Sequence, residues 1–380
     1  MIKDFFYFIL TASLLFSCSK KEQKLCENHY GKPVSLSKRE LKIPIDASTL
    51  SSYQVLSTYY EKDKTDYIFA YNSKMHAIDI FNLKDKVISH IPLQSEGQNG
   101  VLEQAAGIYV HNPDSIWLYS QGNLYLLNKE GKVKSKHVLP FPTKGFIKIE
   151  TNFSISTSNI FYHQERQSIF YLTATPTTES ANYEAYEYSL RTNQFKSYTL
   201  KGELAEEKSG RNFGWKQFPN VTFTPQYIVY NFPITSNIYC IDIETGKEYI
   251  HGGQSKYTPN IVSELKMPYD FKKADKHLLE NVHFFALQYD PYGKVYYRLH
   301  LGKTDFNQNK DFNALYYQKK MYITVFNSRF EIINETELES GKYNYFNCWG
   351  VLNKGLFIAE KATPEEKEEN TFRMELFRIQ

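Results

Sequence analysis

The sequence predicts an all-β protein, most specifically a β-propeller of six blades, with seven blades possible. Aromatic residues make up 16% of the 380-residue chain, with 31 Tyr and 27 Phe, and these residue types suit half-buried strands better than helices. A pair of short strands joined by a polar turn recurs along the chain, whereas helical periodicity is almost absent. A hydrophobic content of 42% excludes a disordered chain.

The recurring unit is an apolar strand followed by a second strand of alternating polarity. Its starting positions differ by 48, 53, 59, 67 and 61 residues, which leaves room for one more strand on each side of every pair. Four strands per unit at this period are typical of a propeller blade. A helical-repeat domain fails on periodicity, and a pair of β-sandwiches fails because no linker divides the chain. The six units begin at Ile68, Ile116, Ile169, Ile228, Val295 and Leu356.

A strand before the first unit is predicted to close the ring. The last unit runs to Gln380 and leaves no chain for its own outermost strand. We expect residues 41–45 to pair with residues 372–379, which removes the open edge between the first and last blades. Pro44 is compatible with this position, because an outermost strand has one edge without a partner. The face that packs on the last blade consists of Leu41, Ile43 and Ile45.

The first residues predict export and a lipid anchor. Residues 5–16 form an apolar run that is too short to span a bilayer but has the length of a signal-peptide core. The sequence Leu15-Phe16-Ser17-Cys18 then resembles the lipobox of bacterial lipoproteins, in which the signal is cut before a cysteine that carries diacylglycerol. Cys18 is therefore the predicted lipidation site, with durable anchoring by two or three acyl chains. The alternative is an ordinary secretory signal with a chance cysteine.

These observations divide the chain into a signal peptide at residues 1–17, a lipidated tether at 18–37 and a propeller domain at 38–380. The expected location is the bacterial cell envelope, with the protein held in the outer membrane by its lipid. Residues 19–24 are mostly basic. Surface-exposed lipoproteins of Bacteroides-like bacteria tend to carry acidic residues there, so the resemblance favours the periplasmic face over the cell surface.

Composition and motifs exclude several functions. The net charge is only +3, from 45 basic and 42 acidic residues, so no footprint for nucleic acid is present. The ten His are dispersed without metal-ligand spacing, and we predict neither a metal site nor a cofactor. Cys240 and Cys348 lie in apolar runs and are expected in the core, while disulfide formation among Cys26, Cys240 and Cys348 is left open. No nucleophile elbow or phosphate-binding loop is present, so no catalytic residue can be named.

Two stretches carry a family resemblance, residues 96–100 with the following strand region at 107–117. On these the chain resembles Bacteroides-type lipoproteins of a domain-of-unknown-function family with a six-bladed, TolB-like propeller. In that family a glycine-rich loop leaves the outer strand of one blade and enters the inner strand of the next. Residues 251–257 look like a second copy of this loop. The resemblance covers nearly the whole mature chain and implies a fold, but no activity.

The glycine-rich loops are the best candidate ligand sites. Glycines let backbone N–H groups approach a ligand, and neighbouring amides, hydroxyls and an ammonium group add hydrogen bonds or charge. A third candidate pairs an Arg, for anions, with a Trp, for stacking on a sugar. The alternative for all three is a structural turn or a packed side chain. The candidate residues are Gly97, Gln98, Asn99, Gly253, Gln254, Ser255, Lys256, Arg211 and Trp215.

The predicted function is a binding or scaffold module that presents its axial face to a partner protein or an envelope glycan. The alternative is a lyase or hydrolase acting on envelope or dietary glycan or peptide, because sites assembled from distant loops leave no local motif. Carboxylates and His with perturbed pKa at the axis favour the enzyme. An axis lined by backbone and aromatic groups favours binding.

Overall fold

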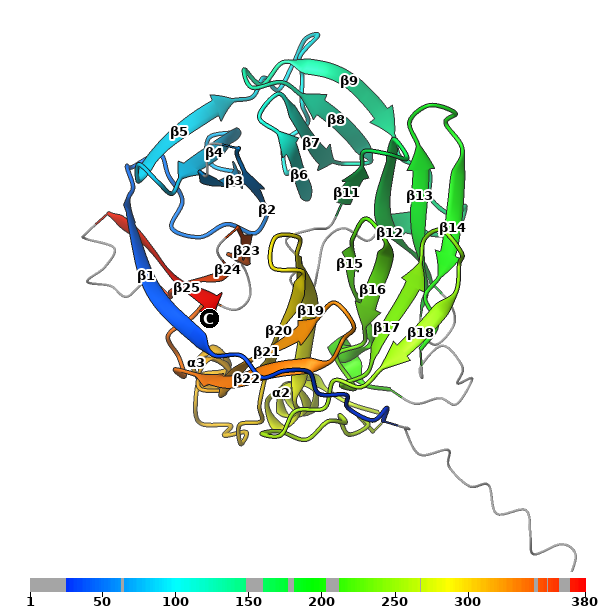
Figure 1. The fold of residues 1–380 in the computed structure, drawn as a ribbon, viewed down its shortest axis with the longest axis vertical. Helices are drawn as coiled ribbons and strands as arrows, with labels where there is room; N and C mark the ends of the chain where they lie inside the picture. The colour runs from blue at the N-terminus through cyan, green and yellow to red at the C-terminus, as the bar shows by residue number, and fades with distance from the viewer. Residues whose placement is uncertain are drawn as a thin grey trace, which may run out of the picture.

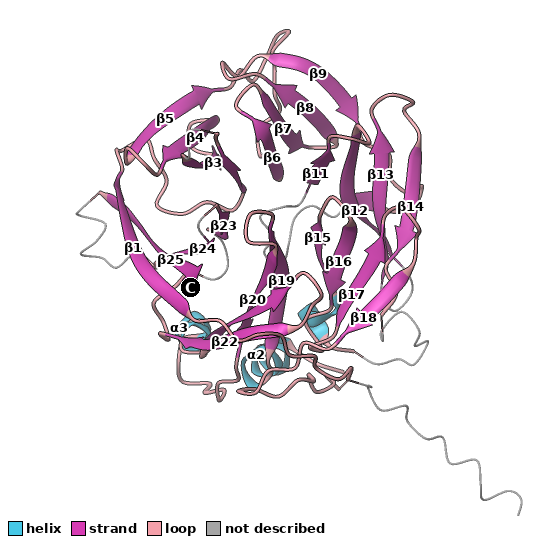
Figure 2. Ribbon diagram, viewed as in Figure 1, coloured by secondary structure: helices cyan, strands magenta, loops and turns pink. Residues whose placement is uncertain are grey.

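The computed structural model describes residues 25–62, 65–147, 160–176, 181–202, 212–266, 268–344, 348–353, 355–361 and 370–380. They form six antiparallel sheets, five with four strands and one with five, arranged as blades in a ring (Figure 1). The predicted six-bladed propeller is therefore confirmed. Helices are short and lie between strands of the blades (Figure 2).

The blades follow one another along the chain. Blade 1 contains β2 (Leu56–Tyr60), β3 (Asp66–Asn72), β4 (Ala77–Asn82) and β5 (Val87–Pro92). Blade 2 contains β6 (Gly107–Asn112), β7 (Ser115–Ser120), β8 (Asn123–Leu127) and β9 (Val133–Val138). Blade 3 contains β10 (Phe146–Ile147), β11 (Ile160–His163), β12 (Ser168–Pro176), β13 (Ala181–Ser189) and β14 (Phe195–Thr199).

The described helices lie beside blades 4 and 5, and the sixth blade includes the first strand of the domain. Blade 4 follows the 3-10 helix η1 (Gly214–Gln217) and contains β15 (Asn220–Phe223), β16 (Tyr227–Asn231), β17 (Ile238–Asp242) and β18 (Glu248–His251). Blade 5 follows α2 (Phe271–Glu280) and contains β19 (His283–Asp290), β20 (Val295–Leu301), α3 (Phe312–Tyr317), β21 (Met321–Asn327) and β22 (Ile332–Leu338). Blade 6 contains β23 (Trp349–Leu352), β24 (Gly355–Ala359), β25 (Thr371–Ile379) and β1 (Leu36–Pro44).

The ring closes as the sequence predicts. β1 is antiparallel to β25, with Leu36 opposite Ile379 and Pro44 opposite Thr371. Ile43 is only 1% exposed and belongs to the core between blades 6 and 1, where Leu41 and Ile45 pack as partly buried neighbours. The first and last strands of the propeller domain thus share one sheet, and the edge between the first and last blades is covered.

The six strand pairs found in the sequence are the second and third strands of the blades. These strands are buried on both faces, because each blade packs between two others, and such strands have nearly continuous apolar runs. The inner strands β2, β6, β11, β15 and β19 were not identified individually by this pattern. Four of them have only four to six residues, and several carry polar or aromatic residues at their ends.

Part of the predicted tether is docked on the propeller. The amide of Cys26 donates to Asn237 Oδ1 at 3.0 Å, and Asn28 exchanges two hydrogen bonds with the backbone of Gln254, at 2.7 and 2.8 Å. The amide of Val34 donates to the carbonyl of Ile333 at 3.0 Å. We call residues 26–34 the N-terminal strap, because they join blades 4 and 5 along the rim of the ring. The predicted signal peptide and the predicted lipidation site, Cys18, lie outside the described residues.

The three cysteines that follow Cys18 in the sequence lie among the described residues. Cys26, Cys240 and Cys348 are all free thiols, and Cys240 and Cys348 are buried core residues, as expected. Burial raises the pKa of Cys348 to about 12, so its thiol is protonated. Among the described residues, no helix is long and apolar enough to cross a membrane.

Candidate functional site

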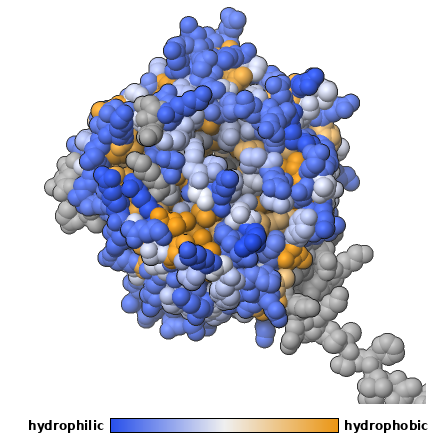
Figure 3. Space-filling model, in the orientation of Figure 1, coloured by the Kyte–Doolittle hydropathy of each residue, from blue (hydrophilic) through white to orange (hydrophobic). Residues whose placement is uncertain are grey.

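A pocket of about 500 Å³ lies at the axis, where the inner strands end. Its lining comes from the carboxyl ends of β2, β6, β11, β15 and β19, together with Val351 of β23, so all six blades contribute. Seen from the side of Figure 1, the rim of the molecule is mostly hydrophilic, and the surface near its centre is paler and hollowed (Figure 3). This volume lies within the range of pockets that hold small molecules, about 300–1,000 Å³.

Aromatic side chains dominate this axial pocket. Rings from neighbouring blades contact each other: Tyr109 of β6 lies 5.3 Å from Phe161 of β11, and His111 lies 5.3 Å from Tyr162, between ring centroids. Such edge-to-face pairs stabilise the ring arrangement beyond simple burial. The lining contains two histidines, His111 and His163. Its Tyr and Phe residues are Tyr59, Tyr60, Tyr109, Phe161, Tyr162, Phe223, Tyr289 and Tyr292.

The pocket is electrically neutral over most of its wall. Burial raises the pKa of Tyr109 to about 12, and burial lowers the pKa of His111, so both side chains are uncharged at neutral pH. Burial also raises the pKa of Tyr292. Among the described residues that line the pocket, Glu165 is the one carboxylate, and it is exposed. The pocket therefore favours a neutral ligand over an ion.

Several polar atoms of the wall already have partners, and others do not. Ser57 Oγ accepts a hydrogen bond from the amide of Val110 at 3.1 Å, and His163 Nε2 lies 2.9 Å from the carbonyl of Pro225. These contacts join adjacent blades. Within the described part of the chain, the hydroxyl groups of Tyr109 and Tyr162 make no hydrogen bond and can serve a ligand as donor or acceptor.

The first predicted glycine-rich loop lies away from the axial pocket. Gly97, Gln98 and Asn99 lie between β5 and β6, where the family resemblance expects a crossing from an outer strand to the next inner strand. None of the three lines the axial pocket. Gly97 has a φ of +81°, which glycine adopts readily, and Asn99 Oδ1 accepts from the amide of Val133 at 3.2 Å. These contacts hold a tight turn between blades 1 and 2.

The second predicted loop lies between β18 and β19, on the opposite side of the ring from the first. Gly253 accepts a hydrogen bond from the buried guanidinium of Arg298, and a Cβ at this position would lie 2.6 Å from the carbonyl of Ser236. Ser255 Oγ lies 3.1 Å from His300 Nε2. Gln254 binds the strap, as described above, and its Nε2 donates to the carbonyl of Cys26 at 2.8 Å.

The remaining predicted site residues do not join these two loops into one site. The amide of Lys256 donates to Glu335 Oε2 at 3.1 Å, and its ammonium group lies 4.8 Å from the ring centroid of Tyr257. Trp215 lies on η1, before blade 4, and Arg211 lies outside the described residues. None of the described residues of the two loops lines the axial pocket.

Sequence reasoning missed the pocket residues because it did not identify the inner strands. A signal was nevertheless present. The inner strands of the first three blades carry aromatic or His side chains at or near their ends, within Thr58-Tyr59-Tyr60, Tyr109-Val110-His111 and Phe161-Tyr162-His163. Aligning these triplets across blades would have brought Tyr and His to the axis.

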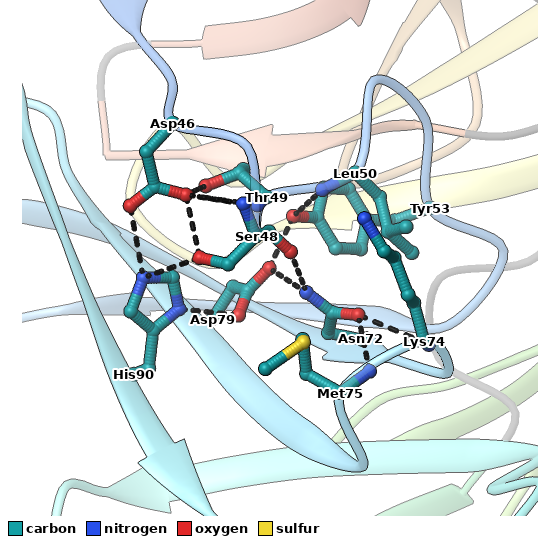
Figure 4. Close-up of polar contacts among 10 residues, drawn as sticks. All are labelled: Asp46, Ser48, Thr49, Leu50, Tyr53, Asn72, Lys74, Met75, Asp79 and His90. Carbon is teal, nitrogen blue, oxygen red and sulfur yellow. Dashed lines mark hydrogen bonds and ion pairs between the residues drawn. The ribbon is translucent and has the colours of Figure 1, made fainter.

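A second polar cluster surrounds Asp79 of β4, which is fully buried (Figure 4). The carboxylate of Asp79 accepts hydrogen bonds from the Tyr53 hydroxyl and from Asn72 Nδ2, the latter at 2.8 Å. Its other oxygen lies 2.7 Å from His90 Nδ1, and His90 Nε2 lies 3.5 Å from Asp46. Asp46 and Tyr53 belong to the segment between β1 and β2, so this cluster fastens the closing strand to blade 1.

The Asp79 cluster is structural rather than catalytic. Hydrogen bonding to Asp79 raises the pKa of His90, and Asp46 adds to this effect. Tyr53 is 2% exposed and Asp79 is 0% exposed, so neither side chain is open to a ligand. Among the described residues, no group of three or more His, Cys, Asp or Glu is arranged to hold a metal ion.

Comparisons with known proteins agree with the fold. A family model described as domain of unknown function DUF4221 matches residues 33–337. A crystal structure of a DUF4221 member from Bacteroides vulgatus is 20% identical, with a TM-score of 0.74 over 92% of this chain and 99% of that one. A Bacteroides fragilis structure is 12% identical, with a TM-score of 0.53 over 93% of this chain and 98% of that one. None of the curated proteins matches this chain.

Proposed function

This chain belongs to the DUF4221 family, and on that premise we propose that it is a lipid-anchored binding protein of the bacterial cell envelope. Its ligand occupies the axial pocket. The ligand is neutral and rich in hydroxyl groups, which favours a saccharide unit of an envelope glycan.

The aromatic lining carries this proposal. A sugar presents C–H groups on its faces and hydroxyls around its edge. Tyrosine rings pack against the faces, and phenol hydroxyls bond to the edge. Tyr109 and Tyr162 supply both kinds of group from adjacent blades. The described lining residues include no Arg or Lys, the residues that phosphate or carboxylate ligands select, and this disfavours such ligands.

Binding is favoured over catalysis by the same lining. A glycan lyase or hydrolase needs an acid and a base at the scissile bond, commonly a pair of carboxyl groups. Among the described lining residues, Glu165 is the one carboxylate, it is exposed, and no second carboxylate accompanies it.

The ligand is tested by screening neutral oligosaccharides, with uronic-acid analogues as charged controls, by thermal shift and calorimetry. Tyr109→Ala is expected to weaken binding of the best neutral saccharide at least about tenfold, since it removes a buried ring. Tyr249→Ala is the matched control, because Tyr249 is a partly exposed tyrosine on the outer strand β18. Preferential binding of the uronic acids, or equal losses in both variants, would contradict the proposal.

The anchor is tested separately. Cys18→Ala is expected to abolish incorporation of labelled lipid and to move the protein from the membrane fraction to the soluble fraction. Unchanged lipid labelling of this variant would contradict lipidation at Cys18. This result is independent of the saccharide measurement, because the axial pocket contains no residue from the first 56 positions.

A further inference from the structure

Many of the exposed apolar side chains come from two segments that meet at the rim of blades 4 and 5. Among the described residues, fifteen large apolar side chains are exposed, and seven of them come from the strap and from residues 249–271. Phe271, the first residue of α2, is 88% exposed, and Tyr30 of the strap is 70% exposed. We call this set the blade 4–5 rim patch: Tyr30, Tyr249, Ile250, Tyr257, Ile261, Tyr269 and Phe271.

The patch lies where the described chain begins. Ile261 pairs with Thr235 in the turn between β16 and β17, and the same turn binds the amide of Cys26 through Asn237. In Figure 1, α2 and the start of the strap lie at the same edge of the ring. The axial pocket is at the centre of the ring, so the patch leaves it uncovered.

Hydrogen bonds fix both ends of α2, the helix that carries Phe271. Asp270 caps α2 by accepting from the amide of Lys273 at 2.8 Å. At the other end of α2, the buried ammonium group of Lys319 donates to the carbonyls of Leu278, Leu279 and Asn281, at 2.8 to 2.9 Å. Phe271 is therefore held at the surface by a fixed helix.

Basic residues accompany these apolar side chains. Residues 249–273 contain four Lys and two acidic residues, Glu264 and Asp270, and the carboxylate of Asp270 serves as the helix cap. Lys272 and Lys273 directly follow Phe271. Aromatic residues beside lysines are typical of the membrane–water interface, where rings lie among head groups and ammonium groups meet anionic lipids.

The number of residues between Cys18 and Leu25 limits the distance between them. Six residues separate Cys18 from Leu25, and an extended chain spans at most about 3.6 Å per residue, or about 25 Å for the seven steps between them. A lipid on Cys18 would thus keep the blade 4–5 rim close to the bilayer, whatever the arrangement of the intervening residues.

We propose that the blade 4–5 rim patch is a membrane-contact surface for a bilayer containing anionic phospholipid. Phe271 enters the head-group region, and Lys272 and Lys273 bind lipid phosphates. The propeller then rests on its rim, with the axial pocket open to the aqueous side. The test of this proposal requires neither the saccharide ligand nor acylation of Cys18.

The test uses the unlipidated chain beginning at Ser19, which retains every described residue, and sedimentation with vesicles of phosphatidylethanolamine and phosphatidylglycerol. Phe271→Ser is expected to weaken vesicle binding about tenfold. Lys272→Gln with Lys273→Gln is expected to weaken it by a similar factor and to reduce its salt dependence. Unchanged melting temperatures would show that these variants fold.

Matched controls lie away from the patch. Val138→Ser removes a 68% exposed apolar side chain from β9, and Lys129→Gln with Lys132→Gln removes two exposed charges from the turn before that strand. Both are expected to bind vesicles within about twofold of the original chain. Equal losses in the controls, or no vesicle binding by the original chain, would overturn the proposal. So would a dimer that Phe271→Ser dissociates without any vesicle binding.

Discussion

The axial pocket and the loops that cross between blades differ in what their polar groups contact. In the crossing loops, Asn99, Gln254 and Gly253 hydrogen-bond to other parts of the chain, and these contacts hold one blade to the next or to the strap. In the pocket, the hydroxyls of Tyr109 and Tyr162 have no such partner among the described residues. Glycine-rich sequence thus marks places where the chain must turn, whereas unpartnered polar groups on a concave wall mark the candidate ligand site.

If polar groups with partners inside the chain serve the fold, removing a buried one should mainly lower stability. The largest loss is expected for Asp79→Ala. The change leaves the Tyr53 hydroxyl and the Asn72 amide without their buried acceptor, and it frees the segment between β1 and β2. We expect a loss of about 3–5 kcal/mol in the free energy of unfolding, measured with denaturant. Asp85→Ala is the control, because Asp85 is an exposed residue that accepts a hydrogen bond from Asn82 on the same blade. Similar losses in both would contradict the structural role of Asp79.

Gly253→Ala is expected to have an intermediate effect. Its new Cβ would lie 2.6 Å from the carbonyl of Ser236 and 2.8 Å from the guanidinium of Arg298, so the loop must shift. The expected cost is about 1–3 kcal/mol of folding free energy. Ligand affinity at the axial pocket should stay within about twofold, since no pocket residue moves directly. A large loss of saccharide affinity with unchanged stability would instead indicate that this loop binds the ligand.

The smallest expected effect is a pH dependence from His90. Its pKa is raised in the folded protein by Asp79, so its charge stabilises the fold fully below the unfolded pKa of about 6.5. This contribution is lost as the pH rises through the higher, folded pKa. Since His90 is partly exposed, solvent screening limits the contribution to under about 1 kcal/mol. His90→Gln should reduce the fall in stability as the pH rises above about 6.5 in denaturant unfolding, and an unchanged slope there would contradict this assignment.

The fold could be predicted from sequence because burial leaves a local pattern. The second and third strands of each blade, such as β7 and β8, are apolar over consecutive positions, and the alternation in residues 41–45 identified the closing strand. The inner strands were harder to recognise, because their ends face the axis and carry Tyr, His and Thr in place of aliphatic residues. The pocket was not predicted for the same reason. Its residues come from all six blades, and only an alignment of the inner strands with one another would bring them together.

The Asp79 cluster teaches a related lesson. An Asp within the apolar strand sequence Ala-Ile-Asp-Ile-Phe indicates a buried partner, but the sequence does not show which residues supply it. The partners Tyr53 and His90 lie 26 residues before and 11 residues after Asp79, and the strand order of blade 1 and the closing segment bring them together.

The most direct measurement compares one hydroxyl in the pocket with the polar groups of the crossing loops. Calorimetry with the best neutral saccharide would use Tyr162→Phe, which removes only the phenol oxygen, and the double variant Gln98→Ala with Lys256→Ala. We predict that Tyr162→Phe weakens binding about 3- to 10-fold, the usual value of one hydrogen bond, and that the double variant binds within about twofold of the original chain. The reverse pattern, with full affinity in Tyr162→Phe and a large loss in the double variant, would contradict the account.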